Sequence, residues 1–239
     1  MPRMGLRENT KELKKMASSP EPLIFFDTHS RFPKSFLQSK DFRGLHLIRH
    51  PKDVAISCAR YHQFSDEEWL HRPWDEYQGR SYQNVITSLP TQRERIIFEL
   101  HNIAGSEIRD MEAFGPSPAF MTVKYEDLIR DQHMSYWHEL LIFLGCDAKE
   151  ICEGIASFYK KSIMFENSLK RDEHVQNGAP DQWTRVFDQP LNELFDELFP
   201  GTLERLGYKD PLSHPVSAMR FCKKKFFFWH TRAGSEEKK

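Results

Sequence analysis

The stretch from Leu45 to His62 reads LHLIRHPKDVAISCARYH, and it constrains the fold more than any other part of the sequence. The hydrophobic, β-favouring residues between Gly44 and Arg49 predict a short buried strand. Pro51 suits the first position of a helix, because it has no amide hydrogen to leave unpaired and its φ is already near the helical value. The apolar residues that follow predict a helix packed on a sheet.

Arg49 stands at the end of this predicted strand, and Ser57 lies two turns into the predicted helix. The N-terminus of a helix favours an anion, because its first amides are unpaired and the macrodipole is positive there. A guanidinium and a hydroxyl that flank such a helix start would suit a phosphate. A plain strand–helix junction with a surface arginine fits the residue types equally well.

The rest of the chain alternates between strand and helix patterns. Strands are predicted at Leu23–Phe26 and Ala119–Lys124, and helices at Gln92–Met111, Tyr136–Leu144, Lys149–Lys161 and Leu191–Phe199. Such alternation indicates an α/β fold with a parallel sheet covered on its faces. The aromatic-rich stretch Ser65–Pro90 is either a mobile loop over a binding cleft or a packed surface excursion.

Composition narrows the class of protein. A chain of 239 residues can form one α/β domain, predicted here at residues 1–210 with a tail at 211–239. The net charge of −1 gives no reason to expect nucleic acid as a partner. The sequence has no apolar run long enough for a transmembrane segment and no signal peptide, and its four cysteines lack metal-type pair spacing. We therefore expect a cytoplasmic protein with reduced thiols.

The segment RHPKDVAIS resembles the part of sulfotransferases that holds the 3'-phosphate of the sulfate donor, 3'-phosphoadenosine 5'-phosphosulfate (PAPS). That family has Arg-Asn-Pro-Lys-Asp, so His50 replaces an asparagine. The resemblance implies that Arg49 and Ser57 bind this phosphate. The Arg-His-Gly motif of histidine phosphatases is a weaker alternative, because Pro51 stands where that family has glycine.

The segment PLIFFDTHSRFPKSF is similar to the sulfotransferase strand that ends in Lys-Thr-His, where the histidine is the catalytic base. This similarity assigns the base to His29. Asp27 stands where the family has a lysine that stabilises the transferring sulfuryl group. An acid at this position would repel the anion.

Two further segments follow in the family's order. VKYEDL resembles the Tyr-Glu-Asp element whose tyrosine contacts adenine, which implies that role for Tyr125. SIMFENSLKRDEHVQNGAPDQW resembles the nucleotide-binding elements that follow, and implies cofactor contacts for Phe165 and Gly178. Gln176 and Asn177 replace the family's Arg-Lys pair in the phosphate loop, so phosphate affinity should fall unless Lys170 and Arg171 compensate.

Together these segments identify the chain as a relative of the cytosolic-type, PAPS-dependent sulfotransferases. The resemblance implies a three-layer α/β fold, with a parallel sheet flanked by helices, of the P-loop NTPase-like sulfotransferase type. It also implies sulfuryl transfer from PAPS as co-substrate, without a metal, to a hydroxyl or amine of a small acceptor, and it allows a homodimer. A generic P-loop kinase is a distant third reading, because the chain has no glycine-rich Lys-Ser/Thr loop.

No stretch of the sequence resembles the family's Thr-Tyr-Pro-Lys-Ser-Gly-Thr-Thr-Trp loop, which cradles the 5'-phosphosulfate. We therefore expect an N-terminally incomplete sulfotransferase fold, and little or no sulfuryl transfer by residues 1–239 alone. The alternative function is that of a catalytically impaired relative which binds the nucleotide or a protein partner.

Overall fold

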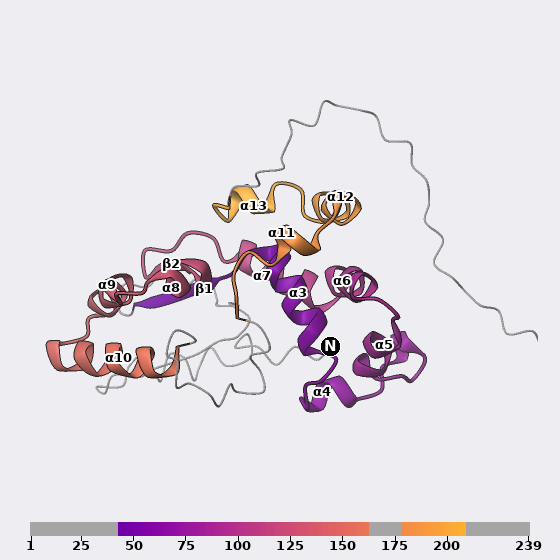
Figure 1. Ribbon diagram of the computed structural model, residues 1–239, viewed down its shortest axis with the longest axis horizontal. Coiled ribbons are helices and arrows are strands. Elements are labelled where there is room, and N and C mark those ends of the chain that lie inside the picture. Colours follow the sequence, from indigo (N-terminus) through magenta and orange to yellow (C-terminus); the bar gives the residue numbers. More distant parts are fainter. Residues whose placement is uncertain (1–42, 163–177, 209–239) are drawn as a thin grey trace, which may run out of the picture. The chain divides into compact units, whose positions relative to one another are not determined.

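The structure is a computed structural model, and it describes residues 43–162 and 178–208. Within these ranges the chain is mostly helical, with one small sheet (Figure 1). The elements, in chain order, are β1 Gly44–Ile48, α3 Pro51–Tyr61, α4 Glu68–His71, the short 3-10 helix η2 Asp75–Tyr77, α5 Tyr82–Ser88, α6 Gln92–His101, α7 Ile103–Ala113, β2 Phe120–Lys124, α8 Tyr125–Arg130, α9 Ser135–Leu144, α10 Ala148–Lys161, α11 Trp183–Val186, α12 Gln189–Leu198 and α13 Thr202–Arg205.

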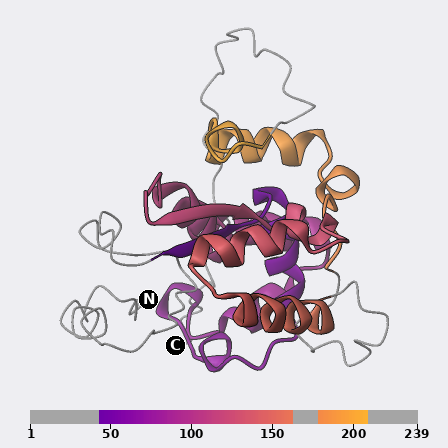
Figure 2. The ribbon, with the colours of Figure 1, turned by 90° about the vertical axis from the view of Figure 1, so that its left-hand side faces the viewer.

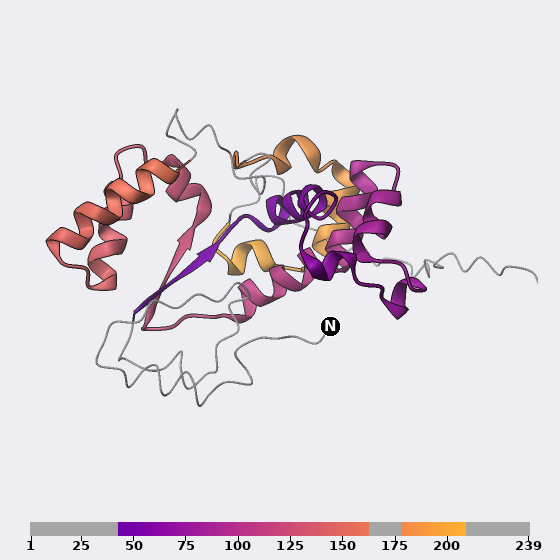
Figure 3. The same ribbon diagram turned by 90° about the horizontal axis from the view of Figure 1, so that it is seen from below.

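The sheet of the described residues consists of β1 and β2, which pair in parallel from Gly44 opposite Phe120 to Ile48 opposite Lys124. Figure 3 shows the two strands side by side, with β1 leading directly into α3. The Phe120 ring packs closely against Gly44, where a Cβ would lie 2.3 Å from the ring unless the ring moved. An α/β fold with a parallel sheet is therefore confirmed for this part of the chain.

The larger hydrophobic core forms where α3 packs against α6 and α7 and is closed by α11 and α12 (Figure 1). The expected single helix Gln92–Met111 is instead two helices, α6 and α7, which meet at Asn102. The Asn102 side chain accepts a hydrogen bond from the Tyr77 hydroxyl and donates one to the Phe98 carbonyl. The close approach of the two helices leaves no room for a Cβ at Gly105, which would lie 2.1 Å from the Leu100 carbonyl oxygen.

A second, smaller core lies over β2, where Val123, Leu128 and Leu140 pack together. Helix α9 ends at Gly145, which adopts a left-handed conformation with φ of 86°. Helix α10 is capped at its N-terminus by Asp147, whose carboxylate accepts hydrogen bonds from the Lys149 and Glu150 amides. Figure 2 shows α9 and α10 as neighbouring helices, and the two predicted helices in this region are confirmed.

The stretch Ser65–Pro90 is a packed excursion rather than a mobile loop. It contains α4, η2 and α5, and the Tyr82 side chain is fully buried at its centre. The rings of Trp69 and Tyr77 lie 5.4 and 6.0 Å from that of Tyr82, and Phe98 of α6 lies at 5.0 Å. Aromatic residues in this stretch therefore fill a core.

The predicted helix at Leu191–Phe199 is confirmed as α12, which ends just before Pro200 and Gly201. The predicted strand Leu23–Phe26 lies outside the described residues. The predicted division into residues 1–210 and a tail at 211–239 remains a prediction, because the described residues end at 208. Among the described residues, every helix is too short or too polar to cross a bilayer.

Candidate functional site

The parallel register of the sheet places Arg49 and Tyr125 at corresponding positions, each being the first residue after its strand. Ile48 pairs with Lys124 at the last rung of the ladder, so the next residue of each chain leaves the same edge of the sheet. The carboxyl ends of parallel strands are where ligands bind in open α/β sheets. The two side chains meet at this edge, with the Arg49 guanidinium carbon 4.9 Å from the centre of the Tyr125 ring.

Arg49 holds its guanidinium against neutral groups. One Nη donates to the Ala179 carbonyl at 3.4 Å, whereas the buried Nε makes no hydrogen bond to a described residue. No described carboxylate lies within ion-pair distance of Arg49. A cation with a buried, unused donor and no ion-paired carboxylate among the described residues is suited to bind an anion.

Gly178 also lies at this edge of the sheet. The Tyr125 hydroxyl donates to the Gly178 carbonyl at 2.6 Å, and burial raises the pKa of Tyr125 above its usual value. Three of the predicted cofactor-binding residues, namely Arg49, Tyr125 and Gly178, are therefore brought together by the fold.

The segment from Gly178 to Trp183 then continues along α3. The Trp183 amide donates to Asp53 at 2.8 Å, and the Arg60 guanidinium donates to the Gln182 side chain. Burial raises the pKa of Asp53, although the hydrogen bond from Trp183 acts in the opposite direction. Both hydrogen bonds come from the C-terminal end of the segment, and their partners on α3 lie about one turn before and one turn after Ser57.

Ser57 lies on the face of α3 that this segment covers. Residues 53, 57 and 60 are spaced by four and three, so they share one side of a helix. The Ser57 side chain is half-buried and makes no hydrogen bond to another described residue. Ser57 therefore lies between the two residues of α3 that bond to the segment, and its role at a phosphate remains a prediction.

The amides at the start of α3 are less available to an anion than the sequence indicated. Pro51, Lys52 and Asp53 are all buried, and the Asp53 carboxylate itself occupies the first turn. Lys52 is fully buried; its Nζ donates to the Asn192 side chain at 2.8 Å and lies 5.0 Å from the centre of the Trp183 ring. The side chains of Arg49 and Ser57 therefore carry the anion-binding potential of this junction.

Sequence analysis did not assign a role to Glu126, which stabilises the junction between β1 and α3 through two hydrogen bonds. Its carboxylate accepts hydrogen bonds from the His50 amide at 2.8 Å and from the Tyr208 hydroxyl at 2.9 Å. The His50 ring stacks on Trp183 at 4.6 Å, with the two planes 6° apart. Burial and the Glu126 charge raise the pKa of Tyr208. Stacking on Trp183 thus accommodates the His50 ring, at the position where the family pattern has asparagine.

His29 and Phe165, the other two predicted site residues, lie outside the described residues. The same holds for Asp27, Gln176 and Asn177, whose chemistry departs from the family pattern. Their roles remain predictions.

Comparison with known proteins gives the family of the chain. The family model described as the sulfotransferase domain matches residues 4–207, which include the junction at Arg49, the strand end at Tyr125 and the segment at Gly178. A search among curated proteins gave no match. Because the match covers most of the 239 residues, the chain belongs to the sulfotransferase family.

Proposed function

We propose that the edge of the sheet at Arg49 and Tyr125 binds the nucleotide of PAPS. We further propose that the fold serves the transfer of a sulfuryl group to a hydroxyl or amine of a small acceptor, at the low rate that we expect of residues 1–239 without a phosphosulfate loop. The observation that supports this proposal most is the juxtaposition of Arg49, Tyr125 and Gly178 at the carboxyl ends of two parallel strands. These residues come from three segments far apart in the sequence, and each was expected at the nucleotide on grounds of sequence alone.

The charges and donors of the site fit a phosphate ester. Arg49 supplies a cation with a spare buried Nε, and Ser57 supplies a hydroxyl two turns along the same helix. Arg60 adds a second cation on the face that carries Ser57. We assign the 3'-phosphate to Arg49 and Ser57, and the adenine to the neighbourhood of the Tyr125 ring.

For the transfer itself, we propose His29 as the base that takes the proton of the acceptor. Phe165 and Gly178 complete the nucleotide site in this proposal, within a three-layer P-loop NTPase-like fold. The reaction as proposed needs no metal, because cationic and amide donors would carry the charge of the transferred group. A small acceptor and a homodimer remain predictions.

Two ligands that differ only in the 3'-phosphate test the nucleotide site. We expect 3',5'-adenosine bisphosphate to bind the 239-residue chain at least about tenfold more tightly than adenosine 5'-phosphate, because each charge-assisted hydrogen bond contributes about 1.5–3 kcal/mol. Isothermal titration calorimetry measures both affinities directly. Equal affinities, or no binding of either nucleotide, would contradict the proposal.

Turnover distinguishes the enzyme from a relative that binds nucleotide without catalysis. Asp27 favours the relative without catalysis, because it places an acid where the family has a lysine. The purified chain would be incubated with sulfur-labelled PAPS and a panel of phenols, alcohols and amines. Binding of the bisphosphate without labelled product would support the non-catalytic relative.

A further inference from the structure

A second cluster of chemically active side chains lies on α3, away from the junction at Arg49. Cys58 lies on this helix and His62, four residues later, is its helical C-cap, so both side chains project from one face. Glu99 of α6 approaches them from the neighbouring helix. The Cys58 sulfur, a His62 ring nitrogen and a Glu99 carboxylate oxygen all lie within 4.8 Å of one another.

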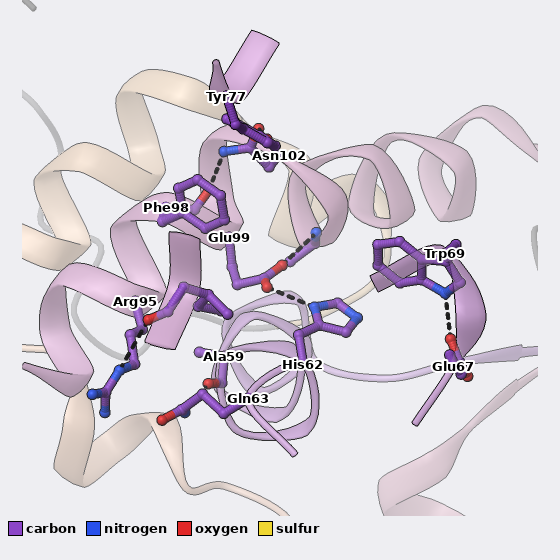
Figure 4. Close-up of polar contacts among 12 residues, drawn as sticks. Ala59, His62, Gln63, Glu67, Trp69, Tyr77, Arg95, Phe98, Glu99 and Asn102 are labelled. Carbon is purple, nitrogen blue, oxygen red and sulfur yellow. Dashed lines mark hydrogen bonds and ion pairs between the residues drawn. The ribbon is translucent and has the colours of Figure 1, made fainter. Parts of the chain in front are cut away.

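The three residues are held well away from water. Glu99 is fully buried, His62 is 4% exposed, and Cys58 is half-buried. His62 Nδ1 lies 2.6 Å from one Glu99 oxygen, and the other oxygen accepts a hydrogen bond from the Ala104 amide at 3.2 Å (Figure 4). A buried carboxylate requires either such partners or a metal ion to offset its lost hydration.

A histidine–glutamate pair alone would account for the 2.6 Å contact, but a third side chain of the cluster points to a ligand. The Cys58 thiol lies beside the pair and supplies a third metal-ligating atom. The fully buried Tyr82 side chain also lies close to Glu99, and burial together with the Glu99 charge raises the pKa of Tyr82. The cluster thus holds three potential metal ligands in one place beside this buried ring.

We propose that Cys58, His62 and Glu99 form a binding site for Zn²⁺. Sulfur, imidazole and carboxylate ligands are those that zinc takes in tetrahedral sites, and three protein ligands leave a fourth position for a water molecule. Bond lengths of about 2.0–2.3 Å place the ligand atoms of such a site about 3.2–3.8 Å apart. Side-chain rotations that move the ligand atoms by about 1 Å would produce this geometry, by separating His62 from Glu99 and bringing the Cys58 sulfur closer to both.

Binding has a defined proton balance. The Cys58 thiol loses its proton to solvent, and neutral His62 binds through Nδ1 while its ring proton sits on Nε2. A bound cation would join α3 to α6 through these side chains, and it takes no part in the proposed sulfuryl transfer.

Cobalt is the most informative probe, because a Co²⁺–thiolate bond gives a charge-transfer band in the near ultraviolet. The reduced chain would be stripped with a chelator and titrated with Co²⁺, and Zn²⁺ would then be added. We expect one equivalent of Co²⁺ to produce the band and Zn²⁺ to abolish it. Cys58→Ser and His62→Gln should each weaken Co²⁺ binding by more than about tenfold. Cys152→Ser, at an exposed cysteine of α10, is the matched control and should leave the titration unchanged.

A second measurement uses the unaltered chain and does not depend on how the variants fold. Zn²⁺ should slow the alkylation of Cys58 by at least about tenfold, and leave the rate at Cys152 unchanged, as read by peptide mass spectrometry. A chelator should restore the original rate. Absence of the cobalt band, its persistence in Cys58→Ser, or alkylation of Cys58 at the same rate with and without Zn²⁺ would overturn the proposal.

Discussion

The buried ring of His46 on β1 allows a test of the burial of this strand, because a titratable group there makes stability depend on pH. Its side chain is 4% exposed and stacks on Phe114 at 3.8 Å, and both ring nitrogens lack a hydrogen bond to the described residues. Burial lowers the pKa of His46 from 6.5 to about 4. Folding therefore requires the neutral ring.

The sign of the pH effect follows from this lowered pKa. The unfolded chain binds a proton at His46 below pH 6.5, whereas the folded chain does so only near pH 4. The contribution of the neutral ring to stability is thus fully present above pH 6.5 and is lost as the pH falls from 6.5 to 4. Each pH unit in this window costs about 1.4 kcal/mol, which gives about 2 kcal/mol at pH 5.

Replacement of the ring by a residue that cannot titrate should remove this loss. We expect the free energy of unfolding of His46→Leu, relative to the wild type, to rise by about 2 kcal/mol between pH 8 and pH 5. Urea unfolding followed by tryptophan fluorescence measures the difference at each pH. His71→Gln, at an exposed histidine of α4, is the matched control and should follow the wild type. Parallel pH curves for His46→Leu and the wild type would refute the argument.

Three further predictions concern the site and its supports. Asp53→Ala should destabilise the chain by about 1–3 kcal/mol, because the buried Trp183 amide loses its acceptor, whereas Asp53→Asn should retain most of the stability; thermal unfolding decides between them. Glu126→Ala should destabilise by a similar ~1–3 kcal/mol, since it leaves the His50 amide unpaired, and Glu126→Gln should be milder in the same assay. Gly44→Val should shift the urea midpoint downward, because its side chain would collide with Phe120, and an unchanged midpoint would contradict the observed register.

Local patterns were sufficient to predict much of the described fold. Pro51 marked the first residue of α3, and Gly145 marked the end of α9, because each residue has a backbone preference that acts without tertiary contacts. The break at Asn102 was missed, since the apolar face of Gln92–Met111 continues through it. That break depends on Tyr77 and on the space left by Gly105, and both are tertiary features.

Sequence analysis named Arg49, Tyr125 and Gly178, which the fold brings together, but none of the residues that support them. The motif around Arg49 and the strand end at Tyr125 are local, and the parallel register alone brings them together. Asp53 and Glu126 pair with residues 130 and 82 positions away, at Trp183 and Tyr208, and no local pattern gives such contacts. The aromatic packing around Tyr82 was left open for the same reason, because a periodicity argument cannot show which rings meet.

The most direct test of the nucleotide site combines one substitution in the chain with a pair of nucleotides, one of which lacks the 3'-phosphate. Calorimetry would measure 3',5'-adenosine bisphosphate and adenosine 5'-phosphate on the wild type, on Arg49→Ala, and on Arg72→Ala as a control at an exposed arginine of the α4 end. We expect Arg49→Ala to weaken the bisphosphate by about 1.5–3 kcal/mol and to leave adenosine 5'-phosphate nearly unchanged. Equal losses for both nucleotides, or no loss for the bisphosphate in a folded Arg49→Ala chain, would contradict the assignment of Arg49 to the 3'-phosphate.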